Sequence, residues 1–139
     1  MSEPVIAEVG GGVDEVRVTL GIYGRDLEPA AITALLGCEP TRSHRRGDST
    51  MRGPAFEQGA WILSIDGNAP ISPDELVRQL LARLPTTPAV WAELRASCRL
   101  HVSVALFVGA WNRGFELALE TSRQLVERGI PIGFSIYVD

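Results

Sequence analysis

The residues best suited to chemistry are four arginines and a histidine that follow a short helix-like segment. Arg42, His44, Arg45, Arg46 and Arg52 gather in one stretch of a chain whose net charge is −4. A guanidinium group presents several N–H donors in a fixed fork that matches a phosphate or a carboxylate. The cluster therefore indicates either a site for an oxyanion or an acidic surface, or structural pairing with the chain's own carboxylates.

Other kinds of site find little support in the residue types. His44, His101, Cys38 and Cys98 do not follow any zinc-ligand spacing. No serine stands in a nucleophile elbow, and no Gly-rich phosphate loop is followed by a lysine. We expect no metal, no cofactor and no catalytic residue; an unrecognised enzyme is kept as the weakest of three hypotheses.

Composition excludes some classes of partner. General nucleic-acid binding needs a basic face to neutralise phosphates, which argues against it for an acidic chain. The sequence contains no apolar run of about 20 residues, so no membrane span is expected. Met1–Pro4 lacks the features of a secretory signal, and the two cysteines do not form a Cys-x-x-Cys pair. These observations predict a cytoplasmic protein with reduced thiols.

Alternating apolar residues predict the strands that must position the arginines. Segments 16–23, 60–65, 99–108 and 132–138 alternate apolar and other side chains, as half-buried strands do. Their inner faces are predicted to carry the following residues: Val16, Val18, Leu20, Ile22, Trp61, Leu63, Ile65, Leu100, Val102, Val104, Leu106, Val108, Ile132, Phe134, Ile136 and Val138.

Helix signals lie between these strands. Pro29 and Gly37 bracket one helix, and Ser72 followed by Pro73 opens another. A third helix is expected to end at Gly129, with Leu125 and Val126 buried. Thr87-Pro88 is compatible with the start of a further short helix, and residues 115–119 with a short extended piece.

The pattern predicts an α+β domain. We expect a two-layer structure, related to the ferredoxin-like class, with a mixed four-stranded sheet and helices mainly on one face, in the order β-α-β-α-β-α-β. Residues 1–15 are expected to be a flexible lead-in, and residues 16–139 a single domain. The basic segment then lies in a long loop from about 41 to 58, and loops of that length are often functional.

The face of the sheet away from the helices is a second candidate site. Small residues there accompany the aromatic side chains of Tyr23, Phe107 and Tyr137. Such a patch is typical of a protein interface, although open sheets also stack nucleic-acid bases. Trp111 and Arg113, in a predicted turn, are further candidates for contact.

Several segments resemble the bacterial family catalogued as domain of unknown function 4279. They are residues 20–29, 32–41 and 45–48, the strand around Trp61, residues 114–117, and the ending from Gly129 to Tyr137. The resemblance implies a self-contained bacterial domain without known cofactors. It brings no activity and no catalytic residues with it.

Three functional hypotheses follow. The preferred one is a non-enzymatic interaction module that binds an acidic protein partner through the arginines and forms a homodimer through the open sheet face. The alternatives are a small-anion or nucleotide binder using the Arg42–Arg46 loop, and an unrecognised enzyme. The candidate binding residues are Arg42, His44, Arg45, Arg46, Arg52, Tyr23, Phe107, Trp111, Arg113 and Tyr137.

Overall fold

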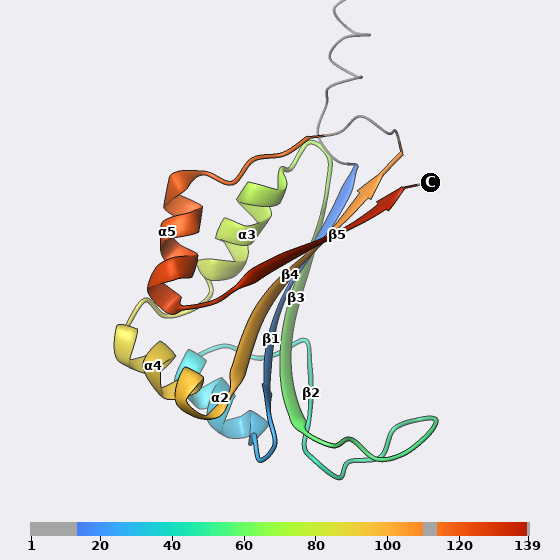
Figure 1. Ribbon diagram of the computed structural model, residues 1–139, viewed down its shortest axis with the longest axis vertical. Coiled ribbons are helices and arrows are strands. Elements are labelled where there is room, and N and C mark those ends of the chain that lie inside the picture. Colours follow the sequence, from blue (N-terminus) through green and yellow to red (C-terminus); the bar gives the residue numbers. More distant parts are fainter. Residues whose placement is uncertain (1–13, 110–113, 139) are drawn as a thin grey trace, which may run out of the picture.

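The computed structural model describes residues 14–109 and 114–138 of the chain. In this part, a curved five-stranded sheet carries its helices on one face and leaves the other face open (Figure 1). The strands are β1 (Glu15–Gly24), β2 (Arg42–His44), β3 (Gly59–Asn68), β4 (Arg99–Val108) and β5 (Ile132–Val138). The helices are α2 (Pro29–Leu36), α3 (Pro73–Leu81), α4 (Pro88–Ser97) and α5 (Leu119–Arg128).

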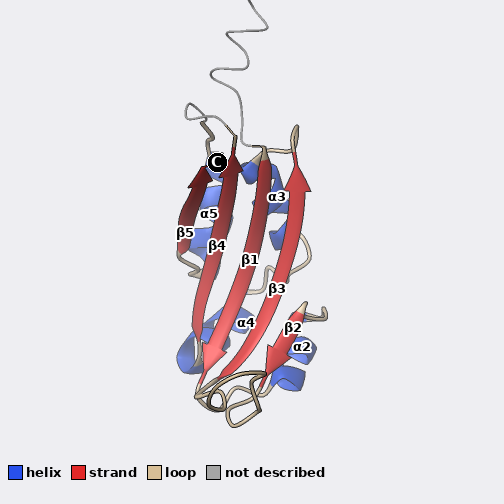
Figure 2. Cartoon of the chain, turned by 90° about the vertical axis from the view of Figure 1, so that its right-hand side faces the viewer, coloured by secondary structure: helices blue, strands red, loops and turns tan. Residues whose placement is uncertain are grey.

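The strands lie in the order β2-β3-β1-β4-β5, so β1 is central and β2 and β5 are the two edges (Figure 2). β1 is antiparallel to both of its neighbours, while β4 and β5 are parallel. The sheet is therefore mixed, as predicted. The connection from β4 to β5 passes through α5 on the helical face, which is the crossover that parallel neighbours require.

Local sequence signals explain where the helices begin and end. Pro29 and Pro73 occupy the start of α2 and α3, where a missing amide hydrogen costs nothing. The Ser72 hydroxyl accepts a hydrogen bond from the Glu75 amide at 3.1 Å and so caps the start of α3. Gly37 ends α2 in the left-handed conformation, with φ of 74°.

The core lies between the helices and the inner face of the sheet. Val16, Val18, Leu20 and Ile22 of β1 are completely buried. Trp61 and Trp91 are also fully buried, and each indole N–H has a partner, the Thr33 hydroxyl for one and the Pro85 carbonyl for the other. Burial of this size is the main stabilising contribution to a domain of this length.

The predicted element order was wrong in two places. The sheet has five strands rather than four, because β2 lies in the segment expected to be a loop. This strand has three polar residues and so shows no alternation; it pairs because the start of β3 offers a free edge. The helix opening at Pro88 is α4, which makes two consecutive helices before β4. Residues 115–118 are not in a strand.

None of the helices in the described ranges is both long and apolar enough to span a membrane.

Candidate functional site

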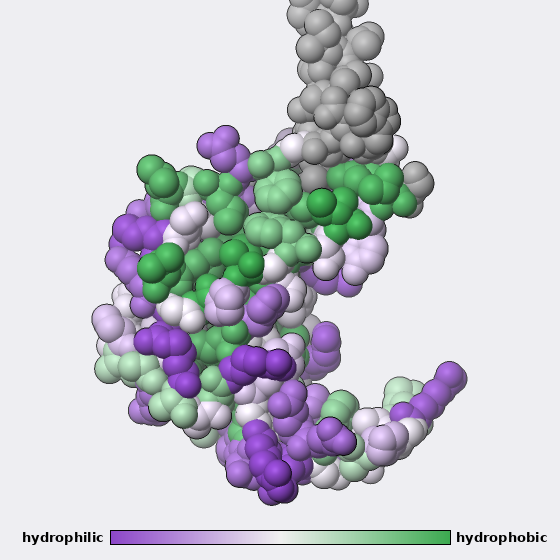
Figure 3. All heavy atoms as spheres, in the orientation of Figure 1, coloured by the Kyte–Doolittle hydropathy of each residue, from purple (hydrophilic) through white to green (hydrophobic). Residues whose placement is uncertain are grey.

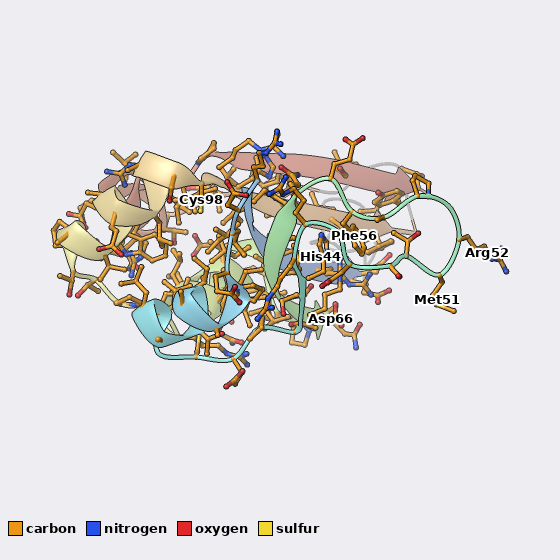
Figure 4. The ribbon with its side chains drawn as sticks, turned by 90° about the horizontal axis from the view of Figure 1, so that it is seen from below. His44, Met51, Arg52, Phe56, Asp66 and Cys98 are labelled. Atoms are coloured by element: carbon orange, nitrogen blue, oxygen red, sulfur yellow. The ribbon has the colours of Figure 1, made fainter. Side chains whose placement is uncertain are left out.

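The segment joining β2 to β3, residues 45–58, projects from the body of the molecule (Figure 1). We call it the arm. Its two sides are joined by hydrogen bonds from the Gly47 amide to the Phe56 carbonyl at 2.8 Å and from the Phe56 amide to the Asp48 carbonyl at 3.0 Å. The rings of His44 and Phe56 stack at its base, with centroids 3.4 Å apart. Met51 and Arg52 lie at the far end and point away from the sheet (Figure 4).

Two of the predicted site arginines pair with the chain's own carboxylates. An Arg45 Nη2 atom lies 2.7 Å from Glu28 Oε1, and an Arg46 Nη2 atom lies 2.8 Å from Asp26 Oδ1. Both carboxylates belong to the turn between β1 and α2. These exposed pairs tie the arm to that turn and contribute little to stability in water.

Arg42 and Arg52 have no ion pair among the described residues. Arg42 is exposed on β2, opposite Ile62 of β3. The five predicted loop residues therefore do not converge on one point. His44 is occupied by its stack on Phe56, and Arg52 is at the far end of the arm.

A different set of arginines comes together where the arm meets the sheet. Arg25, Arg46 and Arg99 line an open depression of about 760 Å³ with Glu57 and Gln58. Arg25 follows β1, and Arg99 begins β4 directly opposite Tyr23. Sequence reasoning missed Arg25 and Arg99, because only the pairing of β1 with β4 brings them beside the arm.

A second depression of about 340 Å³ adjoins the first and shares Arg99 with it. Its remaining lining is Tyr23, Leu100, His101 and Pro131. The Arg99 guanidinium carbon lies 5.1 Å from the centroid of the Tyr23 ring, a distance at which a cation is attracted to the ring face. This contact holds the guanidinium between the two depressions.

Glycines allow the rings on this face to lie close to the sheet. A Cβ atom on Gly21 would lie 2.4 Å from the Tyr23 hydroxyl oxygen, and one on Gly133 would lie 3.1 Å from the His101 ring. The tyrosine thus covers one glycine and the histidine the other. Both rings form a shallow shelf rather than projecting into solvent.

The opposite end of the open face has a different character. There the Phe107 and Tyr137 rings stack with centroids 5.0 Å apart. Between the two ends, Thr19 and Ser64 hydrogen-bond through their hydroxyl groups at 2.8 Å. The strand register confirms that Tyr23, Phe107 and Tyr137 share the open face, but they do not form one aromatic patch.

The apolar side chains of β5 differ from their expected burial. Ile132, Phe134, Ile136 and Val138 do point to the helical face with the core residues of β4. However, Phe134 and Val138 are exposed, and Ile136 is 61% exposed. The prediction that this face of β5 is covered was therefore wrong beyond Ile132, which packs against the core: no described helix or strand lies over the rest, and the Phe115 ring contacts only Phe134 there.

The exposed apolar surface continues onto the C-terminal helix. Val126 is 78% exposed, which contradicts its predicted burial: adjacent helical residues are 100° apart, and Leu125 takes the inward position. We call the exposed apolar residues of this region the β5 patch. Its members are Phe115, Leu119, Val126, Phe134, Ile136 and Val138. Figure 3 shows apolar residues gathered over α5 and β5.

The family model for a domain of unknown function, DUF4279, matches residues 14–139. The chain belongs to this family. No curated protein and no solved structure matches the chain. The DUF4279 match covers both edges of the sheet and the arm.

Two buried ionisable residues of this DUF4279 domain hold α5 in place. Asp74 on α3 accepts hydrogen bonds from the Ala118 amide at 2.8 Å and from Arg78 Nε at 3.0 Å. Burial opposes ionisation of Asp74, but the neighbouring Thr121 hydroxyl, the Ala118 amide and the Arg78 charge outweigh it and hold its pKa below the usual value. The Thr121 hydroxyl faces the carboxylate in looser geometry than the other two donors.

Arg128 is the second buried ionisable residue. Its guanidinium lies 5.7 Å from the Trp91 ring centroid and donates to the Gln124 carbonyl at 3.2 Å. Burial lowers the pKa of Arg128. The positions of Asp74 and Arg128 give them a structural role in the DUF4279 fold, away from both depressions.

The other residues singled out from the sequence are two in the predicted turn and the two cysteines. Trp111 and Arg113 lie outside the described residues. Cys38 and Cys98 are half-buried and form no disulfide with each other; burial raises the pKa of the Cys38 thiol. Among residues 14–109 and 114–138, no cluster of three or more potential metal ligands is present.

Proposed function

We propose that this protein is an interaction module that self-associates by pairing the β5 strands of two copies. The observation that carries the proposal is the β5 patch, which is apolar and exposed and includes three residues of an edge strand. Exposed apolar patches of this kind usually mark protein interfaces. Self-association was expected through the open face of the sheet. The proposal places it instead at the β5 edge, with the apolar side chains on the helical face.

The two edges of the sheet support this choice. The β2 edge has three residues, one of them Arg42, and is followed at once by the arm. Short, charged edges of this type resist pairing with another chain. The β5 edge has seven residues, Ile132–Val138, with neither a charge nor a proline among them. It lacks the features that natural proteins use to block edge pairing.

A two-fold axis at Ser135 would pair the strands with matching faces. In that antiparallel arrangement Phe134 lies opposite the partner's Ile136, and Ile132 opposite the partner's Val138. Residues that point to the helical side in one copy then meet residues of the same side in the other. The same residues contact each other in both directions, as an isologous interface requires, and neighbouring apolar side chains partly shield one another from water.

Size-exclusion chromatography with light scattering tests the proposal. The wild-type chain should elute at twice its 15.1 kDa mass at high concentration. Ile136→Lys should elute as a monomer, because the substitution places a charge in the centre of the pair. Met51→Lys is the matched control, since Met51 is a fully exposed apolar residue on the arm, and should remain dimeric.

A monomeric wild-type chain would contradict the proposal, as would an Ile136→Lys variant that stays dimeric. Circular dichroism of both variants would show that their folds are retained.

An acidic protein partner is a further part of the proposal. Arg42 and Arg52 support it, since neither has an ion pair among the described residues and both are exposed. Replacing both with alanine should weaken capture of such a partner without lowering the melting temperature. An equal loss of thermal stability would indicate a structural role instead.

A further inference from the structure

We infer that the arm end of the open face is a binding site for a nucleotide, separate from the β5 patch. The two adjoining depressions would take its two parts. The phosphate would lie among Arg25, Arg46 and Arg99, and the base on the shelf formed by Tyr23, His101 and Pro131.

The charges of the first depression favour a phosphate. Arg25 and Arg99 have no carboxylate partner among the described residues, and the partner of Arg46, Asp26, has a side chain that is 76% exposed. An ion pair this open to water is weak, so a phosphate can replace it. The lining carries three guanidinium groups and one carboxylate, that of Glu57, so its net charge is positive.

The frame of the site is rigid enough to hold these groups in place. A Cβ atom on Gly59 would lie 2.8 Å from the Leu27 carbonyl oxygen and 3.3 Å from the His44 carbonyl oxygen. The turn after β1, the start of β3 and the base of the arm therefore pack backbone against backbone. The backbone of these elements is thus fixed before a ligand binds, which limits the ordering cost to the side chains.

The lining of the second depression is the reason to propose a nucleotide rather than free phosphate as the ligand. Its lining is mostly aromatic and apolar, and the Tyr23 and His101 rings lie close to the sheet over Gly21 and Gly133. A flat base can stack on the His101 ring, beside the Arg99 guanidinium that lies over Tyr23. Arg99 borders both depressions, so it can contact the phosphate while a base lies next to it on the shelf.

Isothermal titration with adenosine monophosphate, inorganic phosphate and adenosine tests the site in the full chain. The monophosphate should bind, and it should bind more tightly than either phosphate or adenosine alone. Arg25→Ala and Arg99→Ala should each weaken its binding by about tenfold or more, the loss that corresponds to about 1.4 kcal/mol. Arg52→Ala is the control, because this exposed arm arginine lines neither depression, and its affinity should match the wild type.

Three results would overturn the inference. They are the absence of binding at millimolar nucleotide, equal affinity for phosphate and the monophosphate, and an Arg52→Ala variant that loses as much affinity as Arg99→Ala. The β5 proposal is independent of all three, since it depends on the oligomeric state alone.

Discussion

β1 and β5 share the same alternating pattern of side chains but differ in how far those side chains are buried. Both alternate apolar residues with small or polar ones, and both direct their apolar side chains to the helical face. In β1 these side chains are completely buried, whereas in β5 Phe134, Ile136 and Val138 are exposed. The comparison shows that alternation determines which residues share a face, while neighbouring elements determine whether that face is covered.

The difference has a structural cause. β1 is central, with β3 and β4 bonded to its two sides and α3 against its inner face. β5 is an edge strand, and α5 turns Thr121, Leu125 and Arg128 inward over other parts of the core. In the proposed dimer, the partner's β5 would lie beside this strand, and its apolar side chains would partly cover those of β5 on the helical face.

The largest expected effect contrasts the two strands directly. Leu20→Ala in β1 should lower the free energy of unfolding by about 3 kcal/mol, because it leaves a cavity in a packed core. Ile136→Ala in β5, measured at a concentration where the chain is monomeric, should cost less than about 1 kcal/mol, since its side chain is already in water. Urea unfolding measures both values, and similar losses in the two variants would break the comparison.

A smaller effect is expected at the contact between α3, which packs against β1, and the start of α5, which leads into β5. Asp74 on α3 holds the start of α5, so Asp74→Asn should cost about 1–2 kcal/mol at neutral pH by removing a charged acceptor. The pKa of Asp74 is lower in the folded than in the unfolded state. Its stabilising contribution is therefore present above the unfolded pKa and is lost as the pH falls through the folded pKa.

The gap in stability between wild type and Asp74→Asn should accordingly narrow on acidification from neutral pH into the range where carboxylates titrate. Urea unfolding across that range measures it. A gap that does not change with pH would show that the Asp74 charge contributes nothing.

The smallest expected effect concerns the partial cover of β5. The Phe115 and Phe134 rings lie 5.1 Å apart in a tilted contact. Phe115→Ala should lower monomer stability by about 1 kcal/mol, the value of one such aromatic pair, and should also weaken the dimer. Thermal unfolding at low and high protein concentration separates the two effects. If only monomer stability changes, Phe115 lies outside the interface.

Much of the fold could be predicted from local sequence. Ser72 and Gly37 specify a helix start and a helix end through contacts within a few residues of themselves. The alternation in residues 16–23 and 99–108 predicted both the strands and the open face. β2 could not be predicted, because a three-residue polar strand owes its conformation to β3 rather than to its own side chains.

The candidate sites were harder to predict, because they depend on long-range pairing. Arg45 and Arg46 stand out in sequence, yet each binds a carboxylate of the turn after β1. Arg25 and Arg99 are isolated in sequence and meet only when β1 pairs with β4. The exposure of β5 likewise depends on strand order, which alternation does not determine.

Hydrogen–deuterium exchange of the wild-type chain at low and high protein concentration tests the central claim most directly. In a monomer, the β5 amides that do not bond to β4 face water and should exchange rapidly. Pairing of two β5 strands should slow exchange in Ile132–Val138 at high concentration, while exchange in β2 and the arm stays unchanged. Equally fast exchange of β5 at both concentrations, or slowing confined to the open face, would contradict the account.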